Sequence, residues 1–412
     1  MGIAPGLHGS PPMRCAHYDA NRCRSCSELP LPYPAQLAAK QAHARRLLGE
    51  AQWLEPVASR ESGFRNRAKM AVGGSIAQPL LGILDGHGRG VDLADCALYP
   101  PALQAGFAPL KAFITRAAIA PYDLAARRGE LKYVLVTLAE HSGELMVRFV
   151  LRSQEPLARM RRHLDSLREA LPAARVISVN LQPEHKAVLE GEHEILLTTD
   201  ATLAMRVNGL TLHLRPQGFF QTHTAMAAGL YAQAATWVRE LQPASVWDLY
   251  CGVGGFALHC ADSAREVLGV ESSAEAIAAA ARNADEAGLT RVRFHAEDAT
   301  AFATRQTRAA ELVIVNPPRR GLDETLCRWL DTATARWLIY SSCNVESLAR
   351  DLRRMPDLQV QRARVFDLFP HTLHYEVLTL LGRRRCRDAT RRADAAETAR
   401  LSRSGARGSG GP

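Results

Sequence analysis

The sequence lacks long apolar runs. No stretch approaches the about 18 consecutive apolar residues that a membrane-spanning helix needs. The N-terminus also lacks the charged and then apolar pattern of a signal peptide. We therefore expect a soluble, cytoplasmic protein with no membrane partner.

The cysteine content does not favour disulfides. Nine cysteines are an odd number in a chain without an export signal, so metal binding or thiol chemistry is a better explanation for them. The chain also shows no internal repeat. With 412 residues, of which 47% are hydrophobic, it is long enough for two ordinary domains and too long for a single small module.

The charge balance favours an anionic partner. Lys and Arg together number 51 against 42 Asp and Glu, which gives a net charge of +9 and is typical of nucleic-acid binders. Part of this charge lies in residues 383–412, a basic stretch that we interpret as a disordered tail. It is either a solvated extension or an accessory RNA-binding arm. Residues 1–12 are rich in Gly and Pro and are interpreted as a disordered leader.

Two patterns divide the rest of the chain. Residues 13–215 contain short β-like runs and a charged helix near 156–171, which predicts an α+β domain. Residues 216–382 alternate strands with helices, which predicts a doubly wound, Rossmann-like sheet. The fold class is therefore α/β, with a Rossmann-like domain preceded by an α+β domain.

A nucleotide-type site is predicted where the first strand of the second domain ends. Glycines follow Asp248 in the segment Asp-Leu-Tyr-Cys-Gly-Val-Gly-Gly-Phe, and they allow a ligand to approach the backbone. Glu271 closes the next strand, where an acid can accept hydrogen bonds from ribose hydroxyls. Together with Asn316-Pro-Pro-Arg after a later strand, this pattern indicates a methyltransferase.

The residue after Asn316-Pro-Pro separates substrate classes. Methyltransferases that act on exocyclic amines have an aromatic residue there, which stacks on a flipped base. This chain has Arg319 instead. N-methylation is therefore the weaker of the two hypotheses.

Cys343 is the candidate nucleophile. C5 of uracil becomes reactive only after a thiolate adds to C6. A free cysteine titrates near pH ~8.5, so the thiolate needs a cationic or hydrogen-bonding environment. Cys343 lies where a strand gives way to a helix, and we expect the helix N-terminus to stabilise its charge. The alternative is a buried, inert thiol, which is what we expect of Cys251, Cys260 and Cys327.

Glu376 is the candidate general base. After methyl transfer a base must remove the C5 proton so that the thiolate can leave. Glu376 directly precedes an apolar strand, where a carboxylate could serve this purpose. It could equally be a solvated strand end.

Over residues 14–382 the chain resembles the RNA C5-uridine methyltransferases. The resemblance implies that Cys343 is the nucleophile and Glu376 the base. It also implies that S-adenosyl-L-methionine is bound by Gln221, Tyr250, Glu271 and Asn316. The motifs that carry it are Phe219-Phe-Gln-Thr-His, Asp248-Leu-Tyr-Cys-Gly-Val-Gly-Gly-Phe, Asn316-Pro-Pro-Arg-Arg-Gly, Ser341-Ser-Cys-Asn and His374-Tyr-Glu.

Within this family the chain is most similar to the short branch that methylates uridine 747 of 23S ribosomal RNA. The similarity rests on the cysteine-rich segment 15–26 and on the absence of a preceding β-barrel. One departure is His223, where the family usually has Asn. A transfer RNA or another ribosomal site is an alternative target, and a non-catalytic RNA-binding protein is another possible function. We expect a monomer.

Four cysteines form a candidate cluster site: Cys15, Cys23, Cys26 and Cys96. One close pair joined by two single cysteines suits a [4Fe-4S] cluster better than the two close pairs of a zinc site. Zinc remains the alternative. The resemblance also implies iron and sulfur, and we expect a role in folding or RNA positioning.

Two stretches are candidate RNA contacts. Residues 64–69 and 125–133 interleave positive charge with an aromatic residue, as expected for phosphates and splayed-out bases. The target uridine must leave any stack to reach Cys343, so the expected substrate is a single-stranded loop.

Overall fold

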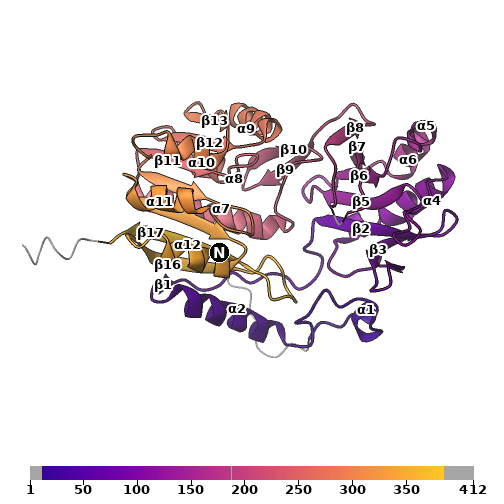
Figure 1. Ribbon diagram of the computed structural model, residues 1–412, viewed down its shortest axis with the longest axis horizontal. Coiled ribbons are helices and arrows are strands. Elements are labelled where there is room, and N and C mark those ends of the chain that lie inside the picture. Colours follow the sequence, from indigo (N-terminus) through magenta and orange to yellow (C-terminus); the bar gives the residue numbers. More distant parts are fainter. Residues whose placement is uncertain (1–11, 187, 385–412) are drawn as a thin grey trace, which may run out of the picture.

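The computed structural model describes residues 12–186 and 188–384. The predicted leader, apart from Pro12, and the predicted tail from residue 385 onward lie outside the described residues. Two large sheets form the molecule, one on each side in Figure 1. Within the described ranges no helix has the length and apolar content to cross a membrane.

The sheet of the C-terminal half has eight strands in the order β1-β16-β17-β15-β14-β11-β12-β13. Its central strands are parallel, while β17 runs antiparallel to both of its neighbours. This arrangement is the predicted Rossmann-like architecture. The strands are β1 (Gln52–Trp53), β11 (Ser245–Leu249), β12 (Glu266–Glu271), β13 (Val292–Ala296), β14 (Leu312–Val315), β15 (Trp337–Ser342), β16 (Leu358–Phe366) and β17 (Glu376–Arg383).

Helices cover both faces of this sheet (Figure 1). Several begin at a side chain that caps free backbone N–H groups, as Asp298 and Asn344 do. These caps fix where each strand-to-helix turn ends. The helices are α7 (Thr224–Leu241), α8 (Gly255–His259), α9 (Ala274–Glu286), α10 (Ala299–Thr304), α11 (Glu324–Thr332) and α12 (Val345–Arg353).

The other sheet has seven strands in the order β4-β3-β2-β5-β6-β7-β8. They are β2 (Arg67–Gly74), β3 (Pro79–Leu84), β4 (Gly90–Asp92), β5 (Leu131–Leu138), β6 (Leu145–Leu151), β7 (Ala174–Leu181) and β8 (His193–Leu196). Four helices accompany it: α3 (Pro101–Gln104), α4 (Phe107–Arg116), α5 (Leu157–Arg162) and α6 (Leu164–Ala170). The single helix predicted near 156–171 is thus two helices, because the backbone at His163 leaves the helical region.

A hairpin follows the seven-stranded sheet. Its strands are β9 (Leu203–Val207) and β10 (Leu210–Leu214). Buried hairpin residues such as Met205 and Leu212 share a core with Leu230 of α7. The hairpin therefore packs with the C-terminal half, although the predicted α+β domain extended to residue 215.

The N-terminal segment also lies against the C-terminal half. It contains α1 (Ala16–Asp19), α2 (Tyr33–Leu48) and β1, and β1 extends the eight-stranded sheet by pairing in parallel with β16. Figure 1 shows α2 running below β16 and β17 while α1 lies under the other sheet. The segment therefore bridges both halves, which the predicted unit 13–215 did not anticipate. Its pairing partner is about 310 residues away in sequence, beyond the reach of local patterning.

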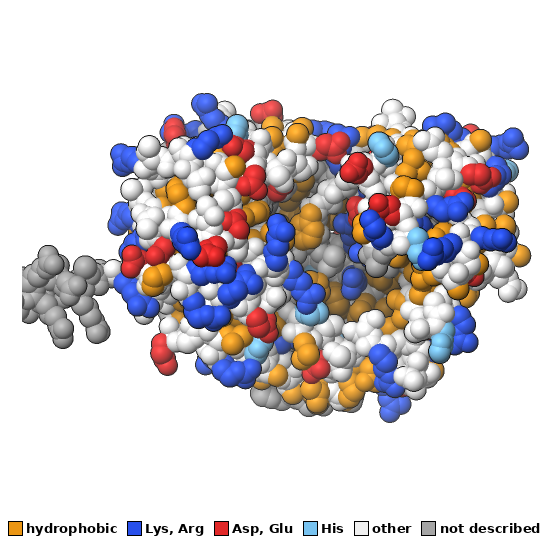
Figure 2. Space-filling view, in the orientation of Figure 1, with side chains coloured by type: hydrophobic (Ala, Val, Ile, Leu, Met, Phe, Trp, Pro, Cys, Tyr) orange, Lys and Arg blue, Asp and Glu red, His pale blue; other side chains and the backbone are white. Residues whose placement is uncertain are grey.

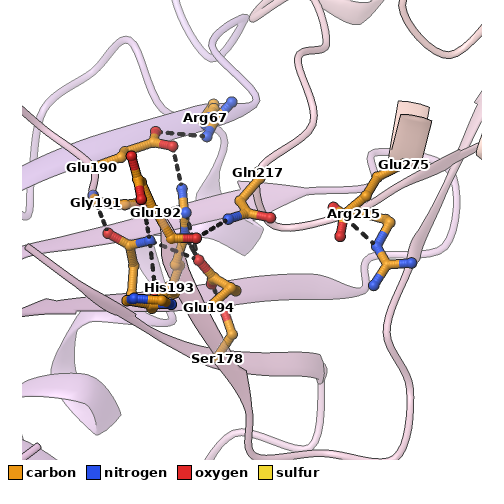
Figure 3. Close-up of polar contacts among 12 residues, drawn as sticks. Arg67, Ser178, Glu190, Gly191, Glu192, His193, Glu194, Arg215, Gln217 and Glu275 are labelled. Atoms are coloured by element: carbon orange, nitrogen blue, oxygen red, sulfur yellow. Dashed lines mark hydrogen bonds and ion pairs between the residues drawn. The ribbon is translucent and has the colours of Figure 1, made fainter. Parts of the chain in front are cut away.

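A buried arginine organises the β8 side of the seven-stranded sheet, and Figure 3 shows the acidic residues Glu190 and Glu194 that it binds. The side chain of Arg148 on β6 is only 1% exposed and binds the carboxylates of Glu190 and Glu194, with N–O distances of 2.6 and 2.5 Å. Ser178 and Asn180 of β7 also donate hydrogen bonds to Glu194. Because these partners satisfy each other, the charges can stay buried.

We predict that Arg148→Met destabilises the protein by about 3 to 5 kcal/mol, because it leaves the half-buried carboxylates of Glu190 and Glu194 without their buried counter-charge. The matched control is Arg328→Met, which removes an exposed pair with Glu324 on one helix and should cost at most about 0.5 kcal/mol. Denaturant unfolding followed by circular dichroism measures both. Equal midpoints for the two variants would contradict the prediction.

Candidate active site

The carboxyl ends of neighbouring parallel strands meet at one edge of the eight-stranded sheet. Leu249 of β11 pairs with Val270 of β12 and with Val315 of β14. The residues that follow these three strand positions, Tyr250, Glu271 and Asn316, therefore lie together. All three are half-buried. This edge is where ligands bind in open α/β sheets.

The turn after β11 has an unusual backbone. Tyr250, Gly252 and Gly254 all have positive φ angles, of 68°, 54° and 88°. A left-handed conformation is strained for tyrosine, and its presence at a candidate site is consistent with a functional constraint. The turn leads directly into α8.

Glu271 is held in place by three donors. Its carboxylate accepts hydrogen bonds from the backbone N–H of Gly252 (3.3 Å), the backbone N–H of Ser273 (3.1 Å) and the hydroxyl of Ser272 (2.9 Å). The acid therefore ties the glycine turn to the end of β12. A carboxylate fixed in this way is pre-positioned to accept further bonds from a ligand.

Asp248 was not predicted as a functional residue. It is fully buried, and its Oδ2 accepts a 2.8 Å hydrogen bond from the backbone N–H of Ala257 in α8. Burial raises its pKa to about 7, although the bond from Ala257 opposes the shift. Its contacts indicate that it holds α8 against the strand beneath the glycine turn. Its position before the glycines was the available signal in the sequence.

Gln221 lies on the segment before α7 and is buried, at 7% exposed. The backbone carbonyl of Gln221 accepts a bond from the side chain of Asn66, which comes from the other half of the molecule. Two residues earlier, Phe219 is 66% exposed, which is unusual for a large apolar side chain. Phe219 was predicted only as part of the Phe219-Phe-Gln-Thr-His motif.

Cys343 and Glu376 are brought together by strand pairing. Ser342 at the end of β15 pairs with Val377, so the next residue along, Cys343, lies beside Glu376 at the start of β17. The Ser341 hydroxyl donates a 2.5 Å hydrogen bond to Oε1 of Glu376. Glu376 is 1% exposed and is therefore not a solvated strand end.

Burial raises the pKa of Glu376 to about 7, and the hydrogen bond from Ser341 opposes that shift. A carboxylate titrating near neutral pH is suited to accept a proton in one step and release it in another. Ser341 is a further site residue that sequence reasoning did not single out.

The expectation for the charge of Cys343 was wrong. Its pKa is raised to about 11, first by burial and then by the charge of Glu376, while Arg319 lowers it. The helix N-terminus does not dominate, because the side chain of Asn344 already accepts bonds from the N–H groups of Glu346 and Ser347. The thiol is therefore protonated at neutral pH in the free protein.

A cavity of about 530 Å³ opens beside Cys343. Arg319 and His374 line it, and their side chains approach to 3.1 Å. Residues of α2 also line it, among them Gln36, Lys40 and His43. Figure 2 shows a hollow between the two halves of the molecule, with Lys and Arg side chains near it.

The four candidate cluster cysteines influence one another electrostatically. The pKa of Cys26 is raised to about 12, first by burial and then by Cys96, Cys23 and Cys15. All four are half-buried. Their two segments are joined by a 2.5 Å contact between His17, which follows Cys15, and Asp95, which precedes Cys96.

The arrangement of the four cysteines bears on which metal group they could bind. Among residues 12–186 and 188–384, no group of three or more His, Cys, Asp or Glu side chains converges on a point where one metal ion could bind. A [4Fe-4S] cubane presents a separate iron to each thiolate, so its four ligands need not converge on one point. Four neighbouring, partly accessible thiols fit such a group.

The first predicted RNA contact is wrong in part. Phe64 is 2% exposed and stacks on the ring of His223, with ring centroids 5.1 Å apart, so it is not available to a base. Arg67 faces Glu190 within the buried network described above. In the second stretch Arg127 and Arg128 are exposed, so that stretch remains a predicted contact.

His223, the departure from the family pattern, has a structural role. Its ring caps α7 by accepting a bond from the N–H of Met226 and lies 2.7 Å from the hydroxyl of Ser59. Burial, followed by the nearby Arg60, lowers its pKa to about 4, so the ring is neutral. It joins α7 to the segment that follows β1.

Comparison with known proteins identifies the family. Residues 137–384, more than half of the chain, match the family described as tRNA (Uracil-5-)-methyltransferase. This chain belongs to that family. A relative from Escherichia coli O139:H28, named 23S rRNA (uracil(747)-C(5))-methyltransferase RlmC, is 52% identical over 90% of this chain and 99% of its own. A relative of the same name from Yersinia enterocolitica has the same identity and coverage.

The uracil-5-methyltransferase fold is also seen in a solved relative. The Pyrococcus abyssi tRNA (uracil-54, C5)-methyltransferase, solved in complex with S-adenosyl-L-homocysteine, has a TM-score of 0.72 and 25% identity. The match covers 86% of this chain and 85% of that one. The predicted Rossmann-like methyltransferase fold is thus confirmed.

We predict that Glu376→Gln lowers the pKa of Cys343 from about 11, because it removes the negative charge that disfavours the thiolate. The measurement is the rate of Cys343 alkylation by iodoacetamide against pH, with peptide mass spectrometry to isolate this thiol. The control is Glu346→Gln, which changes an exposed carboxylate on α12. An unshifted alkylation profile in Glu376→Gln would contradict the prediction.

Proposed function

We propose that this protein transfers a methyl group from S-adenosyl-L-methionine to C5 of a uridine in 23S ribosomal RNA, at the position equivalent to 747. The names of relatives that are 52% identical over nearly their whole length support this target. The observation that carries the chemistry is the pairing of Cys343 with the buried Glu376 across β15 and β17.

The proposed reaction begins at Cys343. Its thiolate adds to C6 of the uracil, and the resulting enolate takes the methyl group from the sulfonium at C5. Glu376 then removes the C5 proton. The electron pair of that C–H bond restores the C5–C6 double bond as the bond from sulfur to C6 breaks, which returns Cys343 as a thiolate.

Two residues would influence whether Cys343 is a thiol or a thiolate. The guanidinium of Arg319 favours the Cys343 thiolate. Glu376 favours it too while its carboxyl is neutral, because the opposing charge is then absent, and the carboxyl must release that proton to solvent before it can accept the C5 proton. The substrate-bound protein would thus reach a reactive thiol although the free protein keeps it protonated.

The proposed contacts to S-adenosyl-L-methionine are Gln221, Tyr250, Glu271 and Asn316. Support comes from the strand ends that place three of them together and from the S-adenosyl-L-homocysteine bound to the Pyrococcus abyssi relative. The carboxylate of Glu271 would receive the ribose hydroxyls.

A transfer RNA is the second candidate substrate, which is favoured by the family description and by the activity that the Pyrococcus abyssi relative is named for. Methylation of an exocyclic amine is disfavoured because Arg319 stands where an aromatic residue would be needed. A non-catalytic RNA-binding role would leave the paired Cys343 and Glu376 without a purpose.

The four cysteines Cys15, Cys23, Cys26 and Cys96 are the proposed ligands of a [4Fe-4S] cluster. Their mutual proximity and partial burial support this assignment. Such a cluster would hold the N-terminal segment to the loop after β4. We further propose that the protein acts as a cytoplasmic monomer on a single-stranded loop of the RNA.

The central test separates the two catalytic steps. We predict that Cys343→Ala abolishes turnover and forms no covalent complex with RNA, because the enolate cannot form. Glu376→Gln should accumulate a methylated covalent complex, because the C5 proton cannot leave. Denaturing electrophoresis with labelled 23S ribosomal RNA fragments and transfer RNA measures both the complex and the target.

The variant that combines Cys343→Ala with Glu376→Gln is the control for this test and should form no covalent complex. A fully active Cys343→Ala protein would overturn the proposed mechanism. Near-normal turnover by Glu376→Gln would remove Glu376 as the base. Methylation of transfer RNA alone would replace the proposed target.

We predict about four iron atoms per chain and a brown colour after anaerobic purification, as expected for a thiolate-bound cluster. Cys96→Ser should lose the iron, whereas Cys343→Ser should keep it. Metal analysis and the visible spectrum measure this. One zinc and no iron per chain would contradict the cluster proposal.

A further inference from the structure

The loop that delivers Glu376 is short and irregular. Residues 367–375, which we name the base loop, connect β16 to β17 and end directly at Glu376. Within it His371 has a positive φ of 64° and is fully buried. A non-glycine residue in this conformation keeps it only when its surroundings hold it there.

One face of α2 contacts the base loop at three points. Gln36, Lys40 and His43 are spaced by four and three residues, so their side chains share one face of the helix. Two of them, Gln36 and Lys40, are buried at 2% and 4% exposed. The mechanism described above assigns no task to these three residues.

The contact at Gln36 fixes the middle of the loop. Its Oε1 accepts a 2.9 Å hydrogen bond from the backbone N–H of His371. Its Nε2 donates to the carbonyls of Glu28 (3.0 Å) and Leu31 (2.8 Å). The N–H of Glu28 in turn donates to the carbonyl of His371 at 3.0 Å. Both backbone groups of His371 are therefore bound by the N-terminal segment.

The other two contacts fix the ends of the loop. The ammonium of Lys40 donates to Oδ1 of Asp367 (2.7 Å) and to the carbonyl of Phe369 (3.0 Å). Nδ1 of His43 lies 2.9 Å from the hydroxyl of Tyr375, the residue directly before Glu376. The row on α2 thus reaches the start, the middle and the end of the base loop.

We infer that this face of α2 is a positioning element for the proton-removal step, in which Gln36, Lys40 and His43 hold the base loop so that Glu376 meets the C5 proton. The inference rests on the proposed function. It gives the N-terminal segment a purpose in the mechanism. In this segment α2 follows the loop that carries Cys23 and Cys26. The base is placed correctly only when α2 is docked.

The test compares Gln36→Ala with Gln41→Ala. Both shorten a glutamine on α2, but Gln41 makes a 3.4 Å contact to the carbonyl of Leu54 and none to the base loop. Gln36→Ala should slow proton removal by about ten- to a hundredfold, since small displacements of a reacting group have effects of this size. Thiol attack and methyl transfer should stay near the wild-type rate.

The readout is the ratio of methylated covalent complex to released product in a single turnover, measured on denaturing gels with labelled RNA. Gln36→Ala should raise this ratio, whereas a variant that is only less stable lowers complex and product together. Tyr375→Phe, which removes one hydroxyl, should raise the ratio less. If Gln36→Ala does not fold, the ratio measured for Tyr375→Phe decides whether α2 positions the base loop.

The outcomes separate this inference from the proposed function. If the wild-type protein forms no C5-methyluridine in any RNA, the proposed function fails. If the wild type methylates RNA but Gln36→Ala and Tyr375→Phe match Gln41→Ala, the positioning role of α2 is overturned. A parallel loss of complex and product in folded Gln36→Ala would also overturn it.

Discussion

The antiparallel pairing of β15 with β17 is the constraint on which the candidate active site depends. The register of these adjacent strands places Cys343 beside Glu376, and the base loop that precedes Glu376 is held by α2. The same closeness lets the charge of Glu376 raise the pKa of Cys343, whereas the pKa of Glu376 itself is raised by burial. The strand pairing that brings the two groups together therefore also helps to keep Cys343 protonated while Glu376 carries its charge.

Much of the fold could be predicted because its signals are local. Glu271 closes the strand Glu266–Glu271, as predicted. The strand pairing also brings together Tyr250, Glu271 and Asn316, since carboxyl ends of parallel strands share an edge. Each of these inferences needed only the residues around one strand end and the rule that parallel strands share an edge.

What could not be predicted depends on distant contacts. The prediction that the helix N-terminus stabilises the Cys343 thiolate was wrong. Burial and the charge of Glu376, which lies on another strand, oppose the thiolate. Phe64 was expected to face RNA, but its partner His223 lies about 160 residues away. The placement of β1 beside β16 is likewise invisible to periodicity. Net charge could not reveal that Arg148 and Arg67 are engaged internally.

The pairing of β1 with β16 has a consequence for how the protein is made. Ribosomes add about 5 to 20 residues per second, so β1 emerges roughly half a minute before the strand that it must join. During synthesis the segment that contains α2 has no sheet to pack against, so it can make non-native contacts. The eight-stranded sheet can therefore be completed only late in synthesis, and the catalytic pocket is complete only after β17 has emerged from the ribosome.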